Sequence, residues 1–580
     1  MAKKSVQAVI PKWRYYLVML FLASLPLVLL VKIAQLQILP SQEHGVDFLQ
    51  NQGDSRAIRN ITIPAYRGLI TDRNGEPLAI STPVTAIIAN PQQIRDEDVR
   101  QVAKAIKVSE SQLKTKLQRY RKKSFMVLVP QLSSDEAEKI LDLNISGVSA
   151  KKTYKRFYPA GEVTAQLVGF TNYKDIGQEG MELAYDDWLT GEEGEKKVVI
   201  DRSKRVINDI SLIKAAKSGE ELRLSIDLRV QYAAYRALKK SVKKHNAKSG
   251  SVVVLDVLTG EVLAMVNQPS FNPNDRTHLR QDAVRNRAMT DLMEPGSTVK
   301  PFTMMAALES GKFSPETLIN TSPGYLKVDY KTFVDPVNYG ELSLAGVLAK
   351  SSQVGTTKVA LELNPEFTRE LFQRVGFGEV IGSGFPGETV GNLPAYRKWD
   401  QVTQATFAFG YGLSVSSLQL ARAYSVLAND GVLKDVSLVA LDSEQASQRV
   451  IDAEISQKVR RMLRAASGVS GTGKRAMIDG YSVGGKTGTL HKVKTGGGYD
   501  ESRYMSAFAG LSPAVNPRLV TVVVIDEPRD GSYFGGLVAA PVFSEVTGSA
   551  LRLLQVTPDQ IDANRSVAGI PKLIKKRGES

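Results

Sequence analysis

The first pattern along the chain is a long apolar run near the N-terminus. Residues 15–31 are uncharged and mostly apolar, and apolar positions continue to residue 39 beyond Lys32. This length meets the lower limit for a helix that crosses a hydrocarbon core, and a lysine near its end can extend its ammonium to the interface. Basic residues precede the run and acidic residues follow it. We therefore expect a cytoplasmic tail over residues 1–14, a transmembrane anchor over 15–39 and an exported remainder.

A cleaved signal peptide is the competing interpretation of this run. Its apolar core would span about 7–15 residues and would lead into a cleavage site of small residues. No clear site of that kind follows residues 15–31. The sequence favours an uncleaved single-pass anchor. If the protein is bacterial, the anchor lies in the inner membrane, with the N-terminus in the cytoplasm and the bulk in the periplasm.

The periodicity of apolar positions changes at about residue 220. Residues 40–219 mix strand-like runs, a stretch with helical spacing over 98–121 and a glycine-rich region. From residue 220, helical segments separate an alternating run, two apolar runs joined by a Thr-Gly turn, and three late strand-like runs. Helices between strands of one sheet, with hairpins joining the late strands, predict an α/β fold with an antiparallel sheet. We expect a non-catalytic domain over 40–219, a second domain over 220–557 and a basic tail over 558–580.

Composition narrows the possible chemistry. With 580 residues the chain needs more than one core, and 43% hydrophobic residues fit a folded protein. It has no cysteine, which excludes disulfides, thiolate catalysis and Cys-ligated zinc. Its four histidines show no spacing typical of a Ser-His-Asp triad or of a metal cluster. We therefore expect no metal and no cofactor.

The net charge of +15 has two interpretations. It would attract an anionic partner, such as nucleic acid, anionic lipid or an acidic wall polymer. A basic surface with two basic tails produces the same number. We favour the second interpretation, because no nucleic-acid-binding motif accompanies the charge. Nucleic acid is therefore not an expected partner.

Residues 297–300 (Ser-Thr-Val-Lys) are the first candidates for chemistry. Ser297 follows Pro-Gly at a predicted helix start, where unpaired N–H groups and the positive end of the helix dipole lie. A spacing of three places Lys300 on the same face. A buried lysine can lose its proton and act as base for a hydroxyl nucleophile, and the N–H groups can stabilise an oxyanion. Context singles out this copy, since the Ser-x-x-Lys pattern also begins at other serines, among them Ser111, Ser211 and Ser241.

Two later motifs complete the equipment for acyl transfer without a histidine. Residues 351–353 (Ser-Ser-Gln) supply a second hydroxyl and an amide. Residues 486–489 (Lys-Thr-Gly-Thr) lie in a strand-like run, so their cation and hydroxyls can face a cleft and bind a carboxylate, and the glycine admits a ligand to the backbone. The candidate residues of the two motifs are Ser351, Gln353, Lys486, Thr487, Gly488 and Thr489.

Two further motif matches are set aside. A second Lys-Thr-Gly at residues 494–496 runs into more glycines and is predicted to be a turn. Residues 468–474 fit G-x-x-x-x-G-K, but Arg475 stands where a phosphate-binding loop has Ser or Thr, and a helical pattern precedes the segment. We expect an ordinary loop there.

The three motifs in this order resemble those of penicillin-binding proteins and β-lactamases. The chain beyond the anchor is similar to class B penicillin-binding proteins, and most of all to the septal peptidoglycan D,D-transpeptidases of Gram-negative cell division. The resemblance implies a transpeptidase domain, an antiparallel sheet with helices on both faces, preceded by a mixed α+β pedestal or dimerisation-type domain. Further motifs carry it at residues 67–75, 156–161, 180–182, 294–297, 409–414 and 533–536.

The resemblance also implies roles for the candidate residues. Ser297 would attack the carbonyl before the terminal D-Ala of a stem peptide, Lys300 would take its proton, and Ser351 would pass a proton to the departing D-Ala. The 486–489 strand would hold the substrate carboxylate, and the N–H groups of Ser297 and Thr489 would form the oxyanion hole. Aromatic side chains are candidate walls of the cleft or ordinary core residues: Phe409, Tyr411 and Phe534.

The implied partners are peptidoglycan stem peptides and β-lactam antibiotics, which would acylate the same serine. At the membrane, the implied partners are a polymerase of lipid-linked glycan and other division proteins. A class A penicillin-binding protein would need a glycosyltransferase domain ahead of the transpeptidase, for which residues 40–220 are short. A β-lactamase would need a water-activating group that we cannot place. A β-lactam sensor is a receptor alternative, with only one membrane pass visible.

Gln353 departs from the family pattern, which usually has asparagine at this position. Glutamine keeps both amide functions but adds a methylene, and a displacement of about 1 Å can cost much activity in a pre-organised site. We hypothesise that Gln353 still orients Lys300 and the substrate amide. The remaining alternatives are a catalytically weakened penicillin-binding scaffold of the division complex and a class B transpeptidase of elongation.

Overall fold

The computed structural model describes residues 11–38, 48, 57–201, 206–395, 399–494 and 496–560. Most of the predicted N-terminal tail (1–14) and of the predicted basic tail (558–580) lies outside the described residues. The chain divides into two compact units. The first comprises Met1–Tyr66, Pro83–Tyr154 and Gly191–Ser218, and the second comprises Arg67–Thr82, Lys155–Thr190 and Gly219–Ser580.

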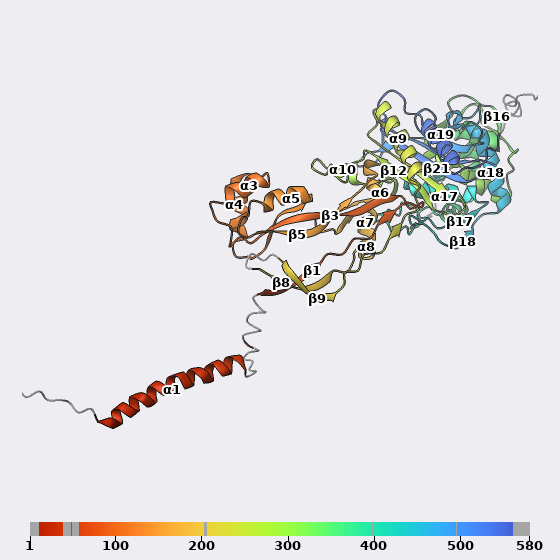
Figure 1. Cartoon of the computed structure of the whole chain (residues 1–580). Coiled ribbons are helices and arrows are strands. Elements are labelled where there is room, and N and C mark those ends of the chain that lie inside the picture. The colour runs from red at the N-terminus through yellow and green to blue at the C-terminus, as the bar shows by residue number, and fades with distance from the viewer. Residues whose placement is uncertain are drawn as a thin grey trace, which may run out of the picture. The chain divides into compact units, whose positions relative to one another are not determined.

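The N-terminal helix α1 (Lys12–Gln37) has the length and composition to span a membrane (Figure 1). Its 26 residues rise about 39 Å, more than the roughly 30 Å of a hydrocarbon core. Within the described ranges it is the one helix that meets both criteria. Its side chains are exposed along most of its length, as contact with lipid requires. The structure thus contains the predicted apolar helix, which begins at Lys12.

The first unit combines a small sheet with a small helical core. The antiparallel sheet has the order β1 (Ile58–Ile63), β8 (Gly194–Ile200), β9 (Val206–Lys214). A separate core lies between β4 (Met126–Leu132), which pairs with β3 (Pro77–Ala89), and the helices α3 (Val99–Ala105), α4 (Glu110–Arg119) and α5 (Ser134–Leu141). The helical stretch expected over 98–121 is broken, because the Ser109 hydroxyl and the Gln112 side chain form a capping box that starts α4 anew.

The second unit is built on a five-stranded antiparallel sheet that is covered on both faces. Alternate residues of the central strands enter two different cores, as the two-residue period of a strand requires. Val252 and Val254 share a core with helices α9 (Leu228–Lys244) and α19 (Gly535–Leu553). The strand order is β12 (Val262–Gln268), β11 (Ser249–Asp256), β21 (Leu519–Asp526), β20 (Tyr499–Ser512), β19 (Gly484–Val493).

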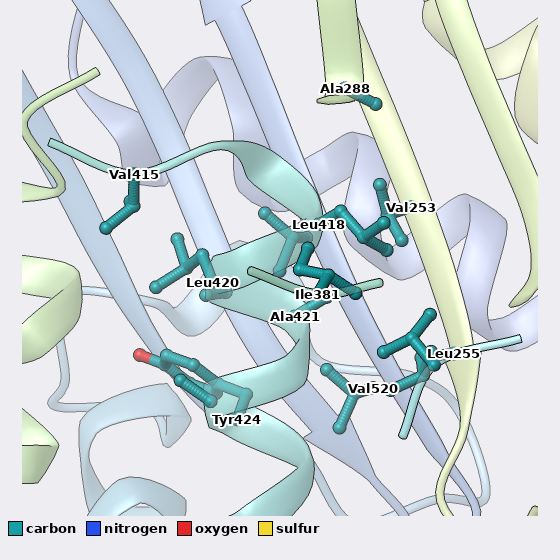
Figure 2. Close-up of a cluster of buried hydrophobic side chains, with 14 of the residues drawn as sticks. Val253, Leu255, Ala288, Ile381, Val415, Leu418, Leu420, Ala421, Tyr424 and Val520 are labelled. Atoms are coloured by element: carbon teal, nitrogen blue, oxygen red, sulfur yellow. The ribbon is translucent and has the colours of Figure 1, made fainter. Parts of the chain in front are cut away.

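The opposite face of this sheet packs against helix α17 (Ser417–Ala428). Figure 2 shows Val253 and Leu255 of β11 beside Leu418 and Ala421 of that helix. Helices on both faces of an antiparallel sheet confirm the predicted fold class. The helices packed with one another and with α17 carry much of the site: α12 (Lys300–Glu309), α13 (Leu344–Lys350), α14 (Gln353–Glu362), α15 (Pro365–Arg374), α16 (Gln401–Phe407) and α18 (Ala453–Ser467).

Helix α12 is fixed in this core by an aromatic cluster. The ring of Phe302 meets Phe377 edge-on at 5.3 Å and Tyr424 edge-on at 5.6 Å between centroids. Such pairs add roughly 0.5–1.5 kcal/mol each beyond burial. Because Phe302 lies two residues after Lys300, this packing fixes the start of α12.

The second unit also buries a cluster of ion pairs away from the main sheet. The Glu182 carboxylate accepts from Arg67 Nε at 2.7 Å and from Arg156 Nε at 2.6 Å. Arg67 also pairs with Asp186 at 2.7 Å. The side chains of Glu182, Arg67 and Arg156 are almost fully buried. The Glu182 carboxylate thereby binds two arginines that lie 115 and 26 positions before it in the chain.

Candidate active site

Ser297 lies in a tight turn that leads into α12. A 3-10 turn over Gly296–Val299 precedes the helix, and Pro301 occupies the first helical turn, where it removes no intrahelical bond. Gly296 has φ of +53°, and a Cβ there would lie 2.1 Å from Leu490 Cδ2. The Tyr424 hydroxyl donates to Thr298 O at 2.7 Å. The turn that presents the Ser297 hydroxyl is therefore held by backbone conformation and by a buried phenol.

Lys300 is fully buried and is held by the Ser-Ser-Gln segment. Its Nζ donates to Ser351 O at 2.7 Å, to Ser351 Oγ at 3.2 Å and to Ser352 O at 3.3 Å. Burial lowers the pKa of Lys300 to about 7, and the negative charge of Asp335 opposes that shift. A lysine with this pKa exchanges a proton readily near neutral pH.

Ser351 connects this lysine to Ser297. The Ser351 hydroxyl accepts from Lys300 Nζ at 3.2 Å and donates to Ser297 Oγ at 3.4 Å. Ser351 ends α13 with left-handed backbone angles of φ 59° and ψ 33°. This conformation is uncommon outside glycine and needs support from its surroundings. The result is a chain of polar atoms from Lys300 Nζ through Ser351 Oγ to Ser297 Oγ.

Asp335 supports the segment that bears Ser351. It lies between β15 (Lys331–Val334) and β16 (Glu341–Ser343) and is buried. Its carboxylate accepts from Ser352 Oγ at 2.5 Å and from the backbone N–H of Gln353 at 2.6 Å. Sequence reasoning misses Asp335, because a lone aspartate before Pro336 has the appearance of any turn residue.

Lys486 lies on the neighbouring edge strand β19. The strand pairs with β20 so that Lys486 stands opposite Ala509 and Thr489 opposite Ser506. Lys486 is fully buried, and its Nζ donates to Thr487 Oγ1 at 3.4 Å. Burial, and then the charge of Lys300, hold the pKa of Lys486 well below its ordinary value.

Three other positions complete this side of the site. Thr487 Oγ1 donates to Thr472 Oγ1 at 3.0 Å, and Thr489 Oγ1 accepts from the Gly535 N–H at 3.0 Å. A Cβ at Gly488 would lie 3.0 Å from Thr298 Cγ2. The missing side chain of Gly488 therefore lets the strand approach the turn of the nucleophile.

A cleft of about 610 Å³ opens over these groups. Lys300 and Lys486 are buried beside it, and Gly488 lies in its wall strand. Tyr411 packs edge-on against Phe409 and Tyr499 instead, at 5.7 and 5.4 Å between centroids. Of the residues predicted for the site, the following line the cleft: Ser297, Ser351, Gln353, Thr487, Thr489 and Phe534.

Basic and aromatic residues surround the opening. Phe534 is 53% exposed and stacks on Tyr533 at 4.5 Å, which stacks in turn on Tyr504 at 4.0 Å. The segment 468–474 forms an ordinary loop as predicted, and it ends at the cleft. None of the described lining residues is acidic. Three of them are basic: Lys350, Lys474 and Arg475.

The other copies of the motifs lie elsewhere. Ser111 is on α4, Ser211 on β9 and Ser241 on α9. The second Lys-Thr-Gly includes residue 495, which lies outside the described residues. Among the residues that the structure describes, no cluster of three or more His, Asp or Glu side chains could hold a metal ion.

Comparisons with known proteins find related families and proteins over most of the chain. The family described as "Penicillin binding protein transpeptidase domain" matches residues 250–548, and the "Penicillin-binding Protein dimerisation domain" matches residues 62–224. The chain is 43% identical over 529 residues to the "Probable peptidoglycan D,D-transpeptidase PbpC" of Pseudomonas aeruginosa, covering 91% of this chain and 94% of that protein. It is 39% identical over 556 residues to the "Peptidoglycan D,D-transpeptidase FtsI" of Escherichia coli, covering 95% and 93%.

Solved structures give the same result. The transpeptidase domain of penicillin-binding protein 3 from Burkholderia pseudomallei, in its apo form, covers 58% of this chain and 98% of its own, with 41% identity and a TM-score of 0.54. A peptidoglycan synthetase from Bifidobacterium adolescentis covers 87% of this chain and 98% of its own, with 26% identity and a TM-score of 0.68.

Proposed function

This chain belongs to the class B penicillin-binding proteins, and from that premise we propose how its residues perform peptidoglycan D,D-transpeptidation. The enzyme is a serine-type acyl transferase that cross-links peptidoglycan stem peptides and is a target of β-lactams. The observation that carries the assignment of residues is the polar chain from the buried Lys300 through Ser351 to Ser297, the last two of which line the cleft.

In the first half-reaction Ser297 Oγ attacks the carbonyl carbon that precedes the terminal D-Ala. Lys300, in its neutral form, takes the hydroxyl proton, as its lowered pKa allows. The backbone N–H groups of Ser297 and Thr489 are assigned to the oxyanion. The C–N bond then breaks, the proton passes through Ser351 to the nitrogen of the departing D-Ala, and an ester remains on Ser297.

In the second half-reaction an amine of a neighbouring strand attacks the ester carbonyl. Lys300 takes a proton from this amine, the C–O bond to Ser297 breaks, the proton passes to the departing Ser297 Oγ, and an amide cross-link forms. The threonine hydroxyls of β19, together with Lys486, are assigned to the carboxylate of the donor peptide. Gln353 is assigned to the peptide amide, because its side chain is exposed and lines the cleft.

A labelling experiment tests these assignments. The full chain in detergent is mixed with a fluorescent penicillin, beside Ser297→Ala. Stable label on the wild type alone supports the mechanism, because a β-lactam mimics the donor peptide and leaves a slowly hydrolysed ester. Rapid loss of label would indicate a β-lactamase, and no label at all would indicate a scaffold.

We also propose the cellular setting. One candidate membrane helix near the N-terminus supports a single-pass protein of the bacterial inner membrane, with residues 1–14 in the cytoplasm, the anchor 15–39 in the membrane and the bulk beyond it in the periplasm. The absence of cysteine makes this testable, since Ser5→Cys and Ser134→Cys would each carry a single thiol. An impermeant maleimide applied to spheroplasts should label only the second.

The division partners are a further proposal. The relation to the E. coli protein named FtsI supports a place in septal wall synthesis, beside a polymerase of lipid-linked glycan and other membrane proteins of division. We assign residues 40–219 to the pedestal that would dock them and residues 220–557 to catalysis. Depletion of the protein should give filaments if it acts at the septum, and rounded cells if it acts in elongation.

A further inference from the structure

We propose that Asp335 is a positioning residue for transpeptidation: it anchors the Ser351–Gln353 segment and its charge acts on Lys300. This inference rests on the proposed function, in which Lys300 is the base for Ser297. Asp335 does not itself line the cleft, and its hydrogen bonds go to Ser352, Gln353 and Val354, so its effect passes through these residues.

The geometric argument begins with the donors that converge on one carboxylate. Asp335 Oδ2 accepts from Ser352 Oγ at 2.5 Å, and Oδ1 accepts from the N–H groups of Gln353 at 2.6 Å and Val354 at 3.3 Å. Asp335 is 4% exposed and Ser352 is fully buried. Charge-assisted bonds in such surroundings are stronger than neutral ones, so they hold the backbone tightly.

The hydrogen bonds to Asp335 come from the same short segment whose carbonyl oxygens bind Lys300. Lys300 Nζ donates to the carbonyl oxygens of Ser351 and Ser352, which are the two residues before Gln353. Ser351 also has left-handed backbone angles, a conformation that persists only where neighbouring contacts impose it. The carboxylate therefore fixes the position of both carbonyls and of the Ser351 hydroxyl.

An ordinary helix cap is the simpler explanation of the same contacts. However, α14 already has a cap, because Ser352 Oγ accepts from the Gly355 N–H at 2.8 Å. A neutral asparagine could accept from the two remaining N–H groups. A buried carboxylate is more than capping requires, and the charge has a nearby cation on which to act.

The charges around Lys300 come from two other elements. Asp335, after β15, favours the protonated lysine, and Lys486, on β19, disfavours it. Tyr339, on the loop beyond Asp335, faces the same carboxylate, and burial together with that charge raises the pKa of its phenol. Removing the Asp335 charge should lower the pKa of Lys300 further. The lysine would then become neutral, and active as a base, at a lower pH.

The experiment compares Asp335→Asn with wild type in the rate constant of acylation by fluorescent penicillin, from about pH 5 to about pH 9, a range that brackets a lysine pKa near 7. We expect the acid limb of the profile to move to lower pH by about one unit, the size of effect of one nearby charge. At a pH well below the limb, each unit gives a tenfold higher rate relative to the plateau. Asp335→Glu, which keeps the charge, should leave the limb near its wild-type position.

Controls separate this inference from folding and from the proposed function. Asp329→Asn removes an exposed carboxylate from the hairpin that precedes Asp335 and should leave both limb and plateau unchanged. Asp335→Ala should lower the plateau as well, because it leaves three donors, two of them in buried hydrogen bonds, without their acceptor. If wild type shows no labelling that depends on Ser297, the proposed function fails. If wild type is labelled and Asp335→Asn keeps the wild-type limb, only this inference is overturned.

Discussion

Replacing Lys300 with methionine should change folding stability in a way that depends on pH. Lys300 is fully buried, and its pKa is lowered from 10.5 to about 7, first by burial and against the opposing charge of Asp335. Between these values the unfolded chain binds a proton that the folded chain does not. Wild-type stability therefore rises with pH across this window. Methionine is of similar length and carries no charge. It therefore removes the cost in folding free energy of keeping Lys300 neutral in the folded chain.

The magnitude follows from the two pKa values. With 10.5 for the unfolded chain and about 7 for the folded chain, the penalty is about 4 kcal/mol at pH 7 and about 2 kcal/mol at pH 9. The variant also loses the bonds from Nζ to Ser351 O and Ser352 O, which lowers its stability by a similar amount at both pH values. The difference between the two conditions, about 2 kcal/mol, isolates the titration and corresponds to about 3 °C in melting temperature.

The measurement is thermal unfolding of the full chain in detergent, at one heating rate, for wild type and Lys300→Met at pH 7 and pH 9. The melting temperature of the variant minus that of wild type should be about 3 °C lower at pH 9 than at pH 7. Lys312→Met is the matched control, since this exposed lysine lies just beyond the same helix. An equal offset from wild type at both pH values would refute the argument that the fold holds Lys300 in its neutral form.

Three further predictions concern neighbouring contacts. Gln353→Asn should leave acylation by fluorescent penicillin intact or faster, because the contacts to Lys300 Nζ come from Ser351 and Ser352; a large loss of rate would contradict the compensation that we hypothesise. Tyr424→Phe should cost about 1–3 kcal/mol and slow acylation, because it leaves the buried Thr298 carbonyl unpaired; melting temperature and labelling rate both report it. Glu182→Gln should cost about 3–5 kcal/mol in thermal unfolding, because two buried guanidinium groups lose their charged partner, and a loss below 1 kcal/mol would count against that burial cost.

The parts of the fold that sequence alone predicts are those with local signals. The apolar run of α1, the short apolar run of β11 and the Pro-Gly turn before Ser297 each encode a structure within a few residues. The Ser109 cap is also a local signal for the break between α3 and α4. The charged residues of 98–121 follow one continuous helical spacing, so the sequence predicts a single helical stretch.

The rest of the site depends on tertiary contacts that no local pattern carries. Asp335 acquires its position because a hairpin folds back onto the start of α14, 17 residues away from Ser352 in sequence. Thr472 lies 15 residues before Thr487 and contacts it from the segment 468–474, for which the sequence predicted only an ordinary loop. Tyr411 belongs to a motif of the resemblance, yet its ring packs against Phe409 and Tyr499, because edge-on aromatic contacts with these neighbours are available there.

The basic lining of the cleft affects which ligands reach the site fastest, before they touch Ser297. Lys350, Lys474 and Arg475 line the opening, and the described lining residues include no carboxylate. Such a rim focuses the field outward over about 8 Å at physiological ionic strength, so it accelerates the approach of anions and not their chemistry. Two β-lactams with equal reactivity toward Ser297 but different net charge would then be captured at different rates. Added salt would abolish the difference, and the entrance would act as a kinetic filter.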